Sequence, residues 1–319
     1  MKNGTAFFHC EASLKIGTGH VMRCLTLAEK LLENNWNCSF ITSEISVNLI
    51  PKLQNFFHLN PEEFYQAPKK CDLMIFDGYQ IEINHEKHFR DFTKKILVID
   101  DLADRSHDCD ILVDQNLGTK IEDYQNLVSK NCKILTGTKY CILREEFSRL
   151  REAALEKRLQ TKTLKNILVN FGGSDLQNHT LKALEEIENS QFLGKINAVL
   201  GFNAEHLQAI QNFSKISKNN IMVHQQANMA ELIYEADLAF AAGGTSTWER
   251  CCLGLPTFLV KIADNQEKIF KELGQKEGFA EFYKKVNSDY QKYFRKIKDY
   301  TDGSGANKVT NIIYETLIL

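Results

Sequence analysis

The chain has 319 residues, of which 43% are hydrophobic and 25% charged, and its formal net charge is −2 at pH 7. This balance is typical of a globular protein rather than a disordered or fibrous one, and it provides no electrostatic reason to expect nucleic acid or an anionic membrane surface as a partner. No apolar run approaches the roughly 20 residues of a membrane-spanning helix, and the opening MKNGTAFFHCEAS lacks the apolar core of a signal peptide. We therefore expect a cytoplasmic protein, not inserted in a membrane, that is long enough for two domains.

Nine cysteines are scattered along the sequence without any CxxC pair. Their odd number and irregular spacing argue against a disulfide framework and against a metal site. Most of them lie beside apolar residues, where a reduced thiol serves as a small core group. We predict reduced, structural cysteines and no bound metal.

Short apolar runs alternate with helical patterns in the first half of the chain, which is typical of a parallel-sheet α/β domain. A helix is expected over 20–34, where apolar residues from Val21 to Leu32 recur at helical spacing. Residues 147–164 are charged and low in strand-forming residues, which predicts a helix and linker. The strands predicted before this segment are 5–10, 37–42, 71–77, 95–101, 109–116 and 132–137.

The same alternation begins again at about residue 165. A strand over 166–173 leads into a glycine turn, and a helix is expected from about Asn178. Further strands are predicted at 196–201, 220–224, 237–244 and 256–262, with helices between them and after Asn265. We expect an α/β protein with two Rossmann-like domains facing each other across a cleft. Their predicted bounds are 1–147 for the N-terminal domain, 148–164 for the linker and 165–319 for the C-terminal domain.

Two Gly-Gly turns, in FGGSD (171–175) and AAGGTSTWE (241–249), each follow a predicted strand and precede a predicted helix. Glycine permits positive φ and close approach of an anion, and a following helix offers free N–H groups and a positive dipole end. Neither turn matches GxGxxG or the Walker lysine motif. Glycine is also common in ordinary strand-to-helix turns, so a diphosphate seat and a purely structural turn both stay open. The candidates are Gly172, Gly173, Gly243, Gly244, Thr245 and Ser246.

Acidic residues provide a second group of candidates. Glu249 falls near the start of the helix after the second glycine turn, where a carboxylate can accept bonds from ribose hydroxyls or simply favour the helix dipole. Asp77, Asp100 and Asp101 lie at the ends of predicted strands, at the sheet edge where ligands bind in open α/β folds. Carboxylates at this edge can orient sugar hydroxyls or a water, but they also cap helices.

The stretch KIGTGHVMRCL (15–25) provides a third group. Gly17 and Gly19 permit a tight turn, and His20 falls at or near the start of the first helix. The positive end of the helix disfavours an imidazolium, so the ring is expected to be neutral at pH 7, as a general base must be. A histidine at a helix start is nevertheless more often a surface or capping residue.

Several stretches together carry a family resemblance: IGTGHVMRCLTLA, YCILREEF, NFGGSD, ADLAFAAGGTSTWERCCLGLP and ADNQ. In this order, from about residue 6 to 270, the sequence resembles the UDP-sugar hydrolases of pseudaminic acid biosynthesis, the PseG type. More distantly, it is similar to glycosyltransferases of the GT-B fold, including the transferase that makes lipid II. The resemblance implies a GT-B-like fold, no cofactor, and a small-molecule UDP-sugar as the only partner of what we expect to be a monomer.

The resemblance also implies an activity and residues that carry it. Such enzymes cleave the anomeric C–O bond of UDP-2,4-diacetamido-2,4,6-trideoxy-β-L-altropyranose with inversion and without a metal, giving UDP and a free sugar for pseudaminic acid and flagellin glycosylation. The family's essential histidine matches His20, its ribose glutamate matches Glu249, and its D-x-Y matches Asp77 and Tyr79. The implied substrate-binding set is Glu11, Gly17, Gly19, Asp77, Tyr79, Gly172, Gly173, Gly243, Gly244, Thr245, Ser246, Glu249, Asn265 and Gln266.

General chemistry fits this reading. Water needs a neutral base beside the anomeric carbon, on the face opposite the diphosphate, and His20 from the N-terminal domain is the predicted base. The departing UDP carries negative charge that glycine N–H groups and helix N-termini can stabilise without Mg²⁺. The N-terminal domain would hold the sugar and the C-terminal domain the nucleotide.

One stretch departs from the family pattern: FHCEAS (8–13) stands where the family usually reads FRxDxS. His9 replaces an arginine and Glu11 an aspartate, and neither pair is equivalent towards a sugar or a carboxylate. The change concerns the identity of the sugar more than the reaction class. Two alternatives stay open, a GT-B glycosyltransferase with a UDP-sugar donor and a nucleotide-sugar-binding protein without catalysis.

Overall fold

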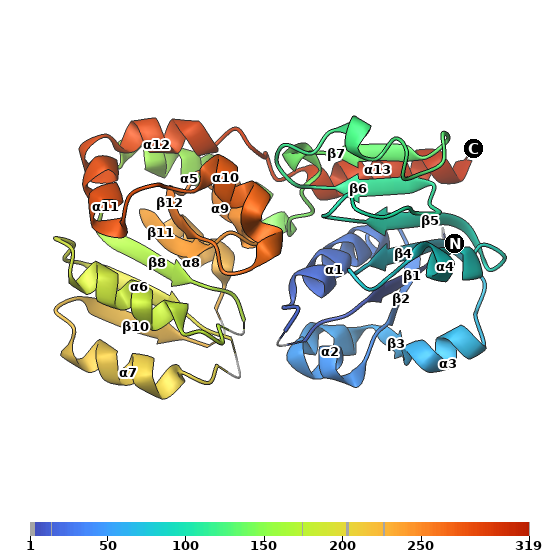
Figure 1. Ribbon diagram of the computed structural model, residues 1–319, viewed down its shortest axis with the longest axis horizontal. Coiled ribbons are helices and arrows are strands. Elements are labelled where there is room, and N and C mark those ends of the chain that lie inside the picture. Colours follow the sequence, from blue (N-terminus) through green and yellow to red (C-terminus); the bar gives the residue numbers. More distant parts are fainter. Residues whose placement is uncertain (1–3, 14, 174, 202–203, 226, 319) are drawn as a thin grey trace. The chain divides into compact units, whose positions relative to one another are not determined.

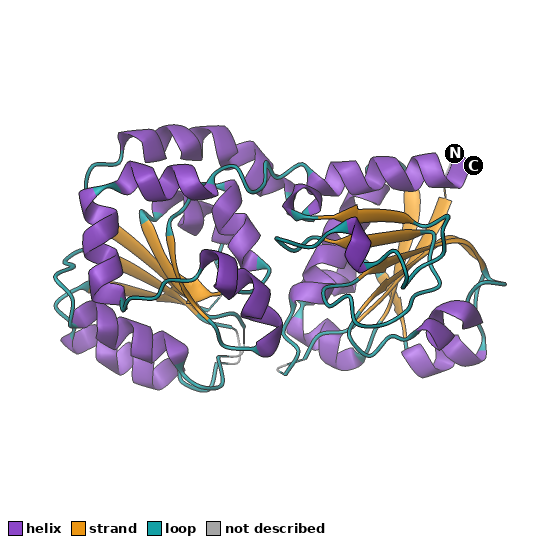
Figure 2. Cartoon of the chain, turned by 45° about the horizontal axis from the view of Figure 1, so that its top comes forward, coloured by secondary structure: helices purple, strands orange, loops and turns teal. Residues whose placement is uncertain are grey.

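The computed structural model describes residues 4–13, 15–173, 175–201, 204–225 and 227–318, without the side chain of Asn265. The chain divides into two compact units, unit 1 with residues 1–144 and 304–319 and unit 2 with residues 145–303. Each unit is a parallel sheet with helices on both faces (Figure 1 and Figure 2). The predicted α/β class with two Rossmann-like units is confirmed.

Unit 1 holds a seven-stranded sheet in the order β3-β2-β1-β4-β5-β6-β7, in which every neighbouring pair is parallel. Its strands are β1 (Gly4–Cys10), β2 (Trp36–Ile41), β3 (Phe57–Leu59), β4 (Cys71–Asp77), β5 (Thr93–Ile99), β6 (Ile111–Asp114) and β7 (Lys133–Thr136). Its helices are α1 (Gly19–Leu32), α2 (Glu44–Leu49), α3 (Pro61–Gln66), α4 (Ile83–His88) and α13 (Gly305–Ile318), with short 3-10 turns η1 (Pro51–Asn55), η2 (Ile121–Asp123) and η3 (Thr138–Tyr140).

The sheet of unit 1 is buried on both faces because successive strand residues point to opposite sides. In β1, Phe8 packs into the cluster that includes residues of α1 and α13, whereas Phe7 packs with Phe64 of α3 and Phe76 of β4. The strands therefore read as continuous apolar runs, which is why their positions were predictable from the sequence. The three-residue strand β3 was not predicted, because it is too short to form a pattern.

Unit 2 holds a five-stranded parallel sheet in the order β10-β9-β8-β11-β12. Its strands are β8 (Asn166–Asn170), β9 (Lys195–Val199), β10 (Asn220–His224), β11 (Leu238–Ala242) and β12 (Thr257–Val260). Its helices are α5 (Glu145–Gln160), α6 (His179–Glu188), α7 (Leu207–Ile216), α8 (Met229–Glu235), α9 (Ser246–Cys252), α10 (Glu267–Leu273), α11 (Phe279–Ser288) and α12 (Tyr290–Ile297), with a 3-10 turn η4 (Asp264–Gln266).

The expected domain bounds need correction at both ends of the second domain. The segment 148–164 is largely helix α5 of unit 2, and the side chains of Phe147, Ala154 and Arg158 are buried there. The C-terminal helix α13 belongs to unit 1 rather than to unit 2, and Figure 1 shows it beside the strands of unit 1. Its apolar stripe, with Val309 and Ile313, packs in the same cluster as α1. The sequence of α13 shows an apolar stripe but does not indicate which of the two sheets the helix packs against.

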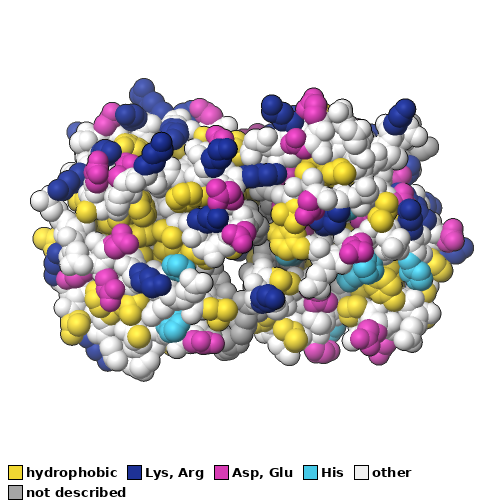
Figure 3. All heavy atoms as spheres, viewed as in Figure 1, with side chains coloured by type: hydrophobic (Ala, Val, Ile, Leu, Met, Phe, Trp, Pro, Cys, Tyr) yellow, Lys and Arg dark blue, Asp and Glu magenta, His cyan; other side chains and the backbone are white. Residues whose placement is uncertain are grey.

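The distribution of surface charge, the state of the cysteines and the length of the helices can be compared with what the composition indicated. On the face shown in Figure 3, acidic and basic side chains are interspersed. All nine cysteines are free thiols, seven of them buried. Within the described part of the chain, no helix is both long enough and apolar enough to span a bilayer.

Candidate active site

The first candidate site lies at the carboxyl edge of the unit 1 sheet, between β1 and β4. These two strands are neighbours, with Cys10 paired to Asp77, yet the chain leaves them towards opposite ends of the sheet. Such a switch in strand order opens a crevice where ligands bind in α/β folds. Helix α1 follows β1 and begins at this edge with Gly19 and His20, while Asp77 ends β4. The topology thus brings a predicted base and a predicted carboxylate together.

His20 and Asp77 form a buried pair. The His20 Nδ1 atom lies 2.6 Å from Asp77 Oδ1, and the two residues are 6% and 1% exposed. A carboxylate accepts hydrogen bonds, so we assign the imidazole proton to Nδ1 and the lone pair to Nε2. This tautomer presents Nε2 as a proton acceptor.

Arg23, one turn further along α1, connects this pair to a second carboxylate. Its guanidinium donates to Asp77 through Nε and Nη2, both at 2.6 Å, and to Asp101 through Nη1 and Nη2, both at 2.9 Å. Burial by itself raises the pKa of Asp77, but the charges of Arg23 and His20 outweigh it and hold that pKa at about 2. Asp77 is therefore ionised throughout the neutral range. Sequence reasoning missed Arg23, although a basic residue three positions after His20 on an otherwise apolar face was a visible signal.

Tyr79 completes the cluster. Its ring meets the His20 ring edge-on, with centroids 4.8 Å apart and an interplanar angle of 84°. Its hydroxyl lies 3.5 Å from Asp101 Oδ2, to which it donates. Both residues of the D-x-Y stretch thus lie against His20.

Asp100, adjacent to Asp101, belongs to a different network. Its carboxylate accepts from the backbone N–H of Ala103 at 2.8 Å and from the Tyr124 hydroxyl at 2.7 Å, and it pairs with Arg105. Of the two aspartates after β5, only Asp101 therefore joins the His20 cluster.

The departures from the family pattern have structural partners. The Glu11 carboxylate accepts from the Ser43 N–H at 2.9 Å and from the hydroxyls of Ser43 and Ser46 at 2.6 Å, so it is engaged at the start of α2. His9 is buried against Tyr65, whose hydroxyl lies 3.3 Å from His9 Nδ1. Burial, with a smaller effect of His85, lowers the pKa of His9 to about 4 and keeps the ring neutral.

Gly17 and Gly19 precede His20 as predicted. Gly17 has φ of +80° and pairs with Ser13 in a small bridge, which forms the tight turn before α1. Gly19 is the first residue of α1. Gly17 thus lies in the predicted turn, and Gly19 begins the helix that carries His20.

The first glycine turn of unit 2 differs from expectation. Gly172 has φ of +87°. Gly201 lies against the backbone of Gly173, so that a Cβ atom on Gly201 would be only 1.7 Å from the carbonyl oxygen of Gly173. However, α6 begins only at His179, and Asp175 accepts from the N–H groups of His179 and Thr180, each at 2.8 Å. A carboxylate therefore already occupies N–H groups at the start of α6, while a phosphate-binding role of Gly172 and Gly173 stays a prediction.

The second glycine turn keeps more of the expected features. β11 and β8 are neighbours at the switch point of the unit 2 sheet, and the turn Gly243–Gly244 leads through Thr245 directly into α9. The side chain of the N-cap residue Thr245 forms no capping hydrogen bond. The Gln266 side chain packs against the turn, with its Cβ 3.6 Å from an ideal Cβ at Gly243, and Glu249 lies half-buried in α9. The predicted Asn265 side chain lies outside the described part of the structure.

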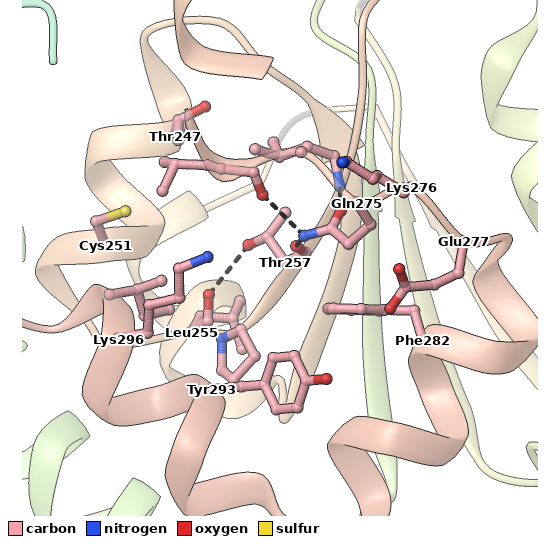
Figure 4. Close-up of a pocket in the computed structure, with 15 residues that line it drawn as sticks. Thr247, Cys251, Leu255, Thr257, Gln275, Lys276, Glu277, Phe282, Tyr293 and Lys296 are labelled. Atoms are coloured by element: carbon pink, nitrogen blue, oxygen red, sulfur yellow. Dashed lines mark hydrogen bonds between the residues drawn. The ribbon is translucent and has the colours of Figure 1, made fainter. Parts of the chain in front are cut away.

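A cavity of about 270 Å³ lies elsewhere in unit 2 (Figure 4). Thr247 and Cys251 of α9 and Thr257 and Leu259 of β12 contribute to its walls. None of the predicted site residues lines it. In the described part of the chain, no group of three or more His, Cys, Asp or Glu side chains is arranged to hold a metal ion.

Comparisons with known proteins agree with the fold and the sequence motifs. No family model matches the sequence. The chain is 27% identical over 283 residues to the UDP-2,4-diacetamido-2,4,6-trideoxy-β-L-altropyranose hydrolase of Campylobacter jejuni, covering 87% of this chain and 98% of the relative. The chain is PseG-like.

Other relatives of this PseG-like chain extend the comparison. An uncharacterized protein of Methanocaldococcus jannaschii is 30% identical over 292 residues, which cover 88% of the chain but 58% of that longer protein. The spore coat polysaccharide biosynthesis protein SpsG of Bacillus subtilis is 28% identical over 260 residues, covering 78% of the chain and 75% of SpsG.

Solved structures share the fold at low sequence identity. MurG of Acinetobacter baumannii matches with a TM-score of 0.68 and 14% identity, covering 98% of the PseG-like chain and 99% of MurG. Staphylococcus aureus MnaA, solved with UDP, matches with a TM-score of 0.66 and 11% identity, covering 99% and 97% of the two chains. At these identities, the likeness concerns the fold alone.

Proposed function

We propose that this protein hydrolyses a UDP-linked 2,4-diacetamido-2,4,6-trideoxy hexose at the anomeric C–O bond, with inversion and without a metal, and releases UDP and a free sugar for nonulosonic (pseudaminic) acid synthesis. The observation that carries the proposal is the buried His20–Asp77 pair at the β1–β4 switch point. The similarity to the Campylobacter jejuni hydrolase over nearly its whole length supports the choice of substrate.

The charge balance around His20 supports its role as the base. Asp77 and Asp101 contribute two negative charges and Arg23 one positive charge, so the cluster carries one net negative charge when His20 is neutral. Transfer of a proton from water to His20 would make the cluster neutral, so Asp77 and Asp101 are placed to offset the positive charge that develops on the base during the reaction.

The proposed step is a single displacement. Nε2 of His20 accepts a proton from water as the water oxygen bonds to the anomeric carbon, and the C–O bond to the diphosphate breaks with its electron pair leaving on UDP. Asp77 holds the imidazole in the required tautomer and stabilises the imidazolium. Inversion follows because the water attacks opposite the leaving group.

Unit 2 is proposed to hold the nucleotide. The backbone N–H groups of Gly243–Gly244 would face the phosphates, with Thr245, Ser246 and Gln266 beside them, and the Glu249 carboxylate would accept bonds from the ribose hydroxyls. We assign the second glycine turn the larger role, since Asp175 occupies the start of α6 after the first.

One incubation separates this proposal from its alternatives. The purified protein is mixed with the UDP-sugar in buffer containing EDTA, and UDP and the free sugar are followed by NMR. Release of UDP in water alone, with an inverted anomer formed first, supports the hydrolase. Release only with an added acceptor alcohol would identify a glycosyltransferase. Binding without turnover would identify a nucleotide-sugar-binding protein.

We further propose that the protein acts as a cytoplasmic monomer. Size-exclusion chromatography with light scattering tests the oligomeric state, and a mass of twice the 36.6 kDa chain would contradict it. Fractionation of the native cells tests the compartment.

A further inference from the structure

Arg250 lies behind the second glycine turn and is bonded to residues on both sides of it. The residue is 1% exposed. Its guanidinium donates to the Ala242 carbonyl at 2.8 Å, to the Ser246 hydroxyl at 3.0 Å and to the Thr247 hydroxyl at 3.1 Å. Ala242 precedes Gly243–Gly244 and the two hydroxyl residues follow it, so one side chain fastens both ends of the turn.

Arg250 has no ion-pair partner within the described part of the chain, and its Nε has no hydrogen-bond partner there. Burial lowers the pKa of Arg250 to about 10, while the smaller effects of Cys251 and Glu249 raise it, so the guanidinium is still charged at neutral pH. A buried cation without a counter-ion is costly. By contrast, the equally buried Arg23 pairs with two carboxylates.

We propose that Arg250 is a positioning residue whose charge is compensated by the diphosphate of a bound nucleotide, an inference that rests on the proposed function. Arg250 acts through the turn that it fastens rather than by touching the substrate. The Ser246 hydroxyl accepts from Arg250 and therefore keeps its own proton to donate to an acceptor outside. The positive charge behind the turn adds to the attraction for an anion because the low-dielectric interior screens it little.

The chain provides a matched control in Arg158. It is also fully buried, and its guanidinium donates to the backbone carbonyls of Ala236 and Ile233. Ala236 precedes β11, whereas Ala242 ends it, so the two arginines lie at opposite ends of the same strand. Substitution of Arg158 therefore removes a buried arginine from unit 2 but leaves the hydrogen bonds at the glycine turn in place.

The experiment measures binding by calorimetry for the wild type, Arg250→Lys, Arg250→Met and Arg158→Met. The ligands are UDP, uridine and inorganic pyrophosphate, and circular dichroism checks the fold of each variant. We expect Arg250→Met to weaken UDP and pyrophosphate binding about tenfold or more, while uridine binding stays within about twofold. Arg250→Lys keeps the positive charge but lacks the planar set of guanidinium donors, so its affinity for UDP and pyrophosphate should fall about two- to fivefold.

The comparison of ligands makes the outcome decisive. Arg158→Met should leave UDP binding within about twofold of the wild type, since its effect is limited to folding stability. Equal losses for UDP and uridine in the Arg250 variants, or equal losses in Arg158→Met and Arg250→Met, would show a merely structural arginine and overturn the inference. A wild-type protein that binds pyrophosphate in an Arg250-dependent manner but does not bind UDP would instead overturn the proposed nucleotide and leave the role of Arg250 standing.

Discussion

His20 Nδ1 lies 2.6 Å from Asp77 Oδ1, although 57 positions separate the two residues in the sequence. One residue comes from the start of a helix and the other from the end of a strand, and they meet because β1 and β4 are neighbours in the sheet. The pair determines which imidazole nitrogen can act as a base, and most of the predictions below depend on it.

Replacing His20 should abolish turnover while leaving nucleotide binding intact. We expect His20→Ala to lose measurable UDP release, because no other proton acceptor replaces Nε2, and to keep UDP affinity within a few-fold. Steady-state assays and calorimetry measure the two effects. A variant with rates like the wild type would remove His20 from the role of base.

Replacing Asp77 by Asn should reduce kcat more than it changes KM. The amide can present an N–H to the imidazole and favour the wrong tautomer, which we expect to cost about 10²-fold or more in kcat. Tyr79→Phe is the matched comparison, since it keeps the ring against His20 and removes the hydroxyl that donates to Asp101. If the two substitutions had equally small effects, Asp77 would not orient the base.

Asp77 should also contribute to the pH dependence of stability. Its folded pKa of about 2 lies below the ordinary value of 3.8, so its stabilisation is complete above about pH 4 and is lost as the pH falls towards 2. The shift corresponds to about 2 kcal/mol in the free energy of unfolding. Urea titrations between pH 5 and about pH 2 measure it. Asp77→Asn should lack this part of the acid loss, and an unchanged profile in the variant would contradict the assignment.

Glu249→Ala should weaken UDP binding. Loss of a charged hydrogen-bond acceptor for the ribose hydroxyls is expected to cost roughly 1–3 kcal/mol. Calorimetry with UDP and with inorganic pyrophosphate distinguishes the ribose from the phosphates, because pyrophosphate affinity should not change. Equal UDP affinity in variant and wild type would remove Glu249 from the ribose site.

Glu11→Ala should affect stability more than catalysis. The carboxylate accepts hydrogen bonds from Ser43 and Ser46 at the start of α2, and loss of hydrogen bonds to a charged group costs about 2 kcal/mol. Denaturant unfolding should show this loss, while kcat/KM changes less than threefold, a range typical of residues outside the substrate contacts. A changed preference among UDP-sugars with unchanged stability would restore Glu11 to the sugar site.

Local patterns in the sequence determined the α/β class, most strands, helix α1 and the glycine turns. A parallel strand that is buried on both faces appears as a continuous apolar run, and an amphipathic helix shows apolar residues at helical spacing. Each of these patterns is contained within a short stretch of sequence, so it can be recognised without the rest of the chain. His20 and Asp77 were candidates from local patterns, and the motif resemblance added Tyr79; the fold brings the three together.

Only the tertiary structure decided which residues meet across long separations. In the structure, α13 belongs to unit 1, and Arg23 pairs with the carboxylates of Asp77 and Asp101. Glu11 accepts hydrogen bonds at the start of α2, and Asp175 accepts them at the start of α6. The tertiary structure also leaves Arg250 buried behind the second glycine turn without a carboxylate among the described residues. Composition and periodicity cannot reveal such pairings, because a carboxylate at a strand end can cap a helix or orient a base equally well, and the neighbour that decides between them comes from a distant part of the chain.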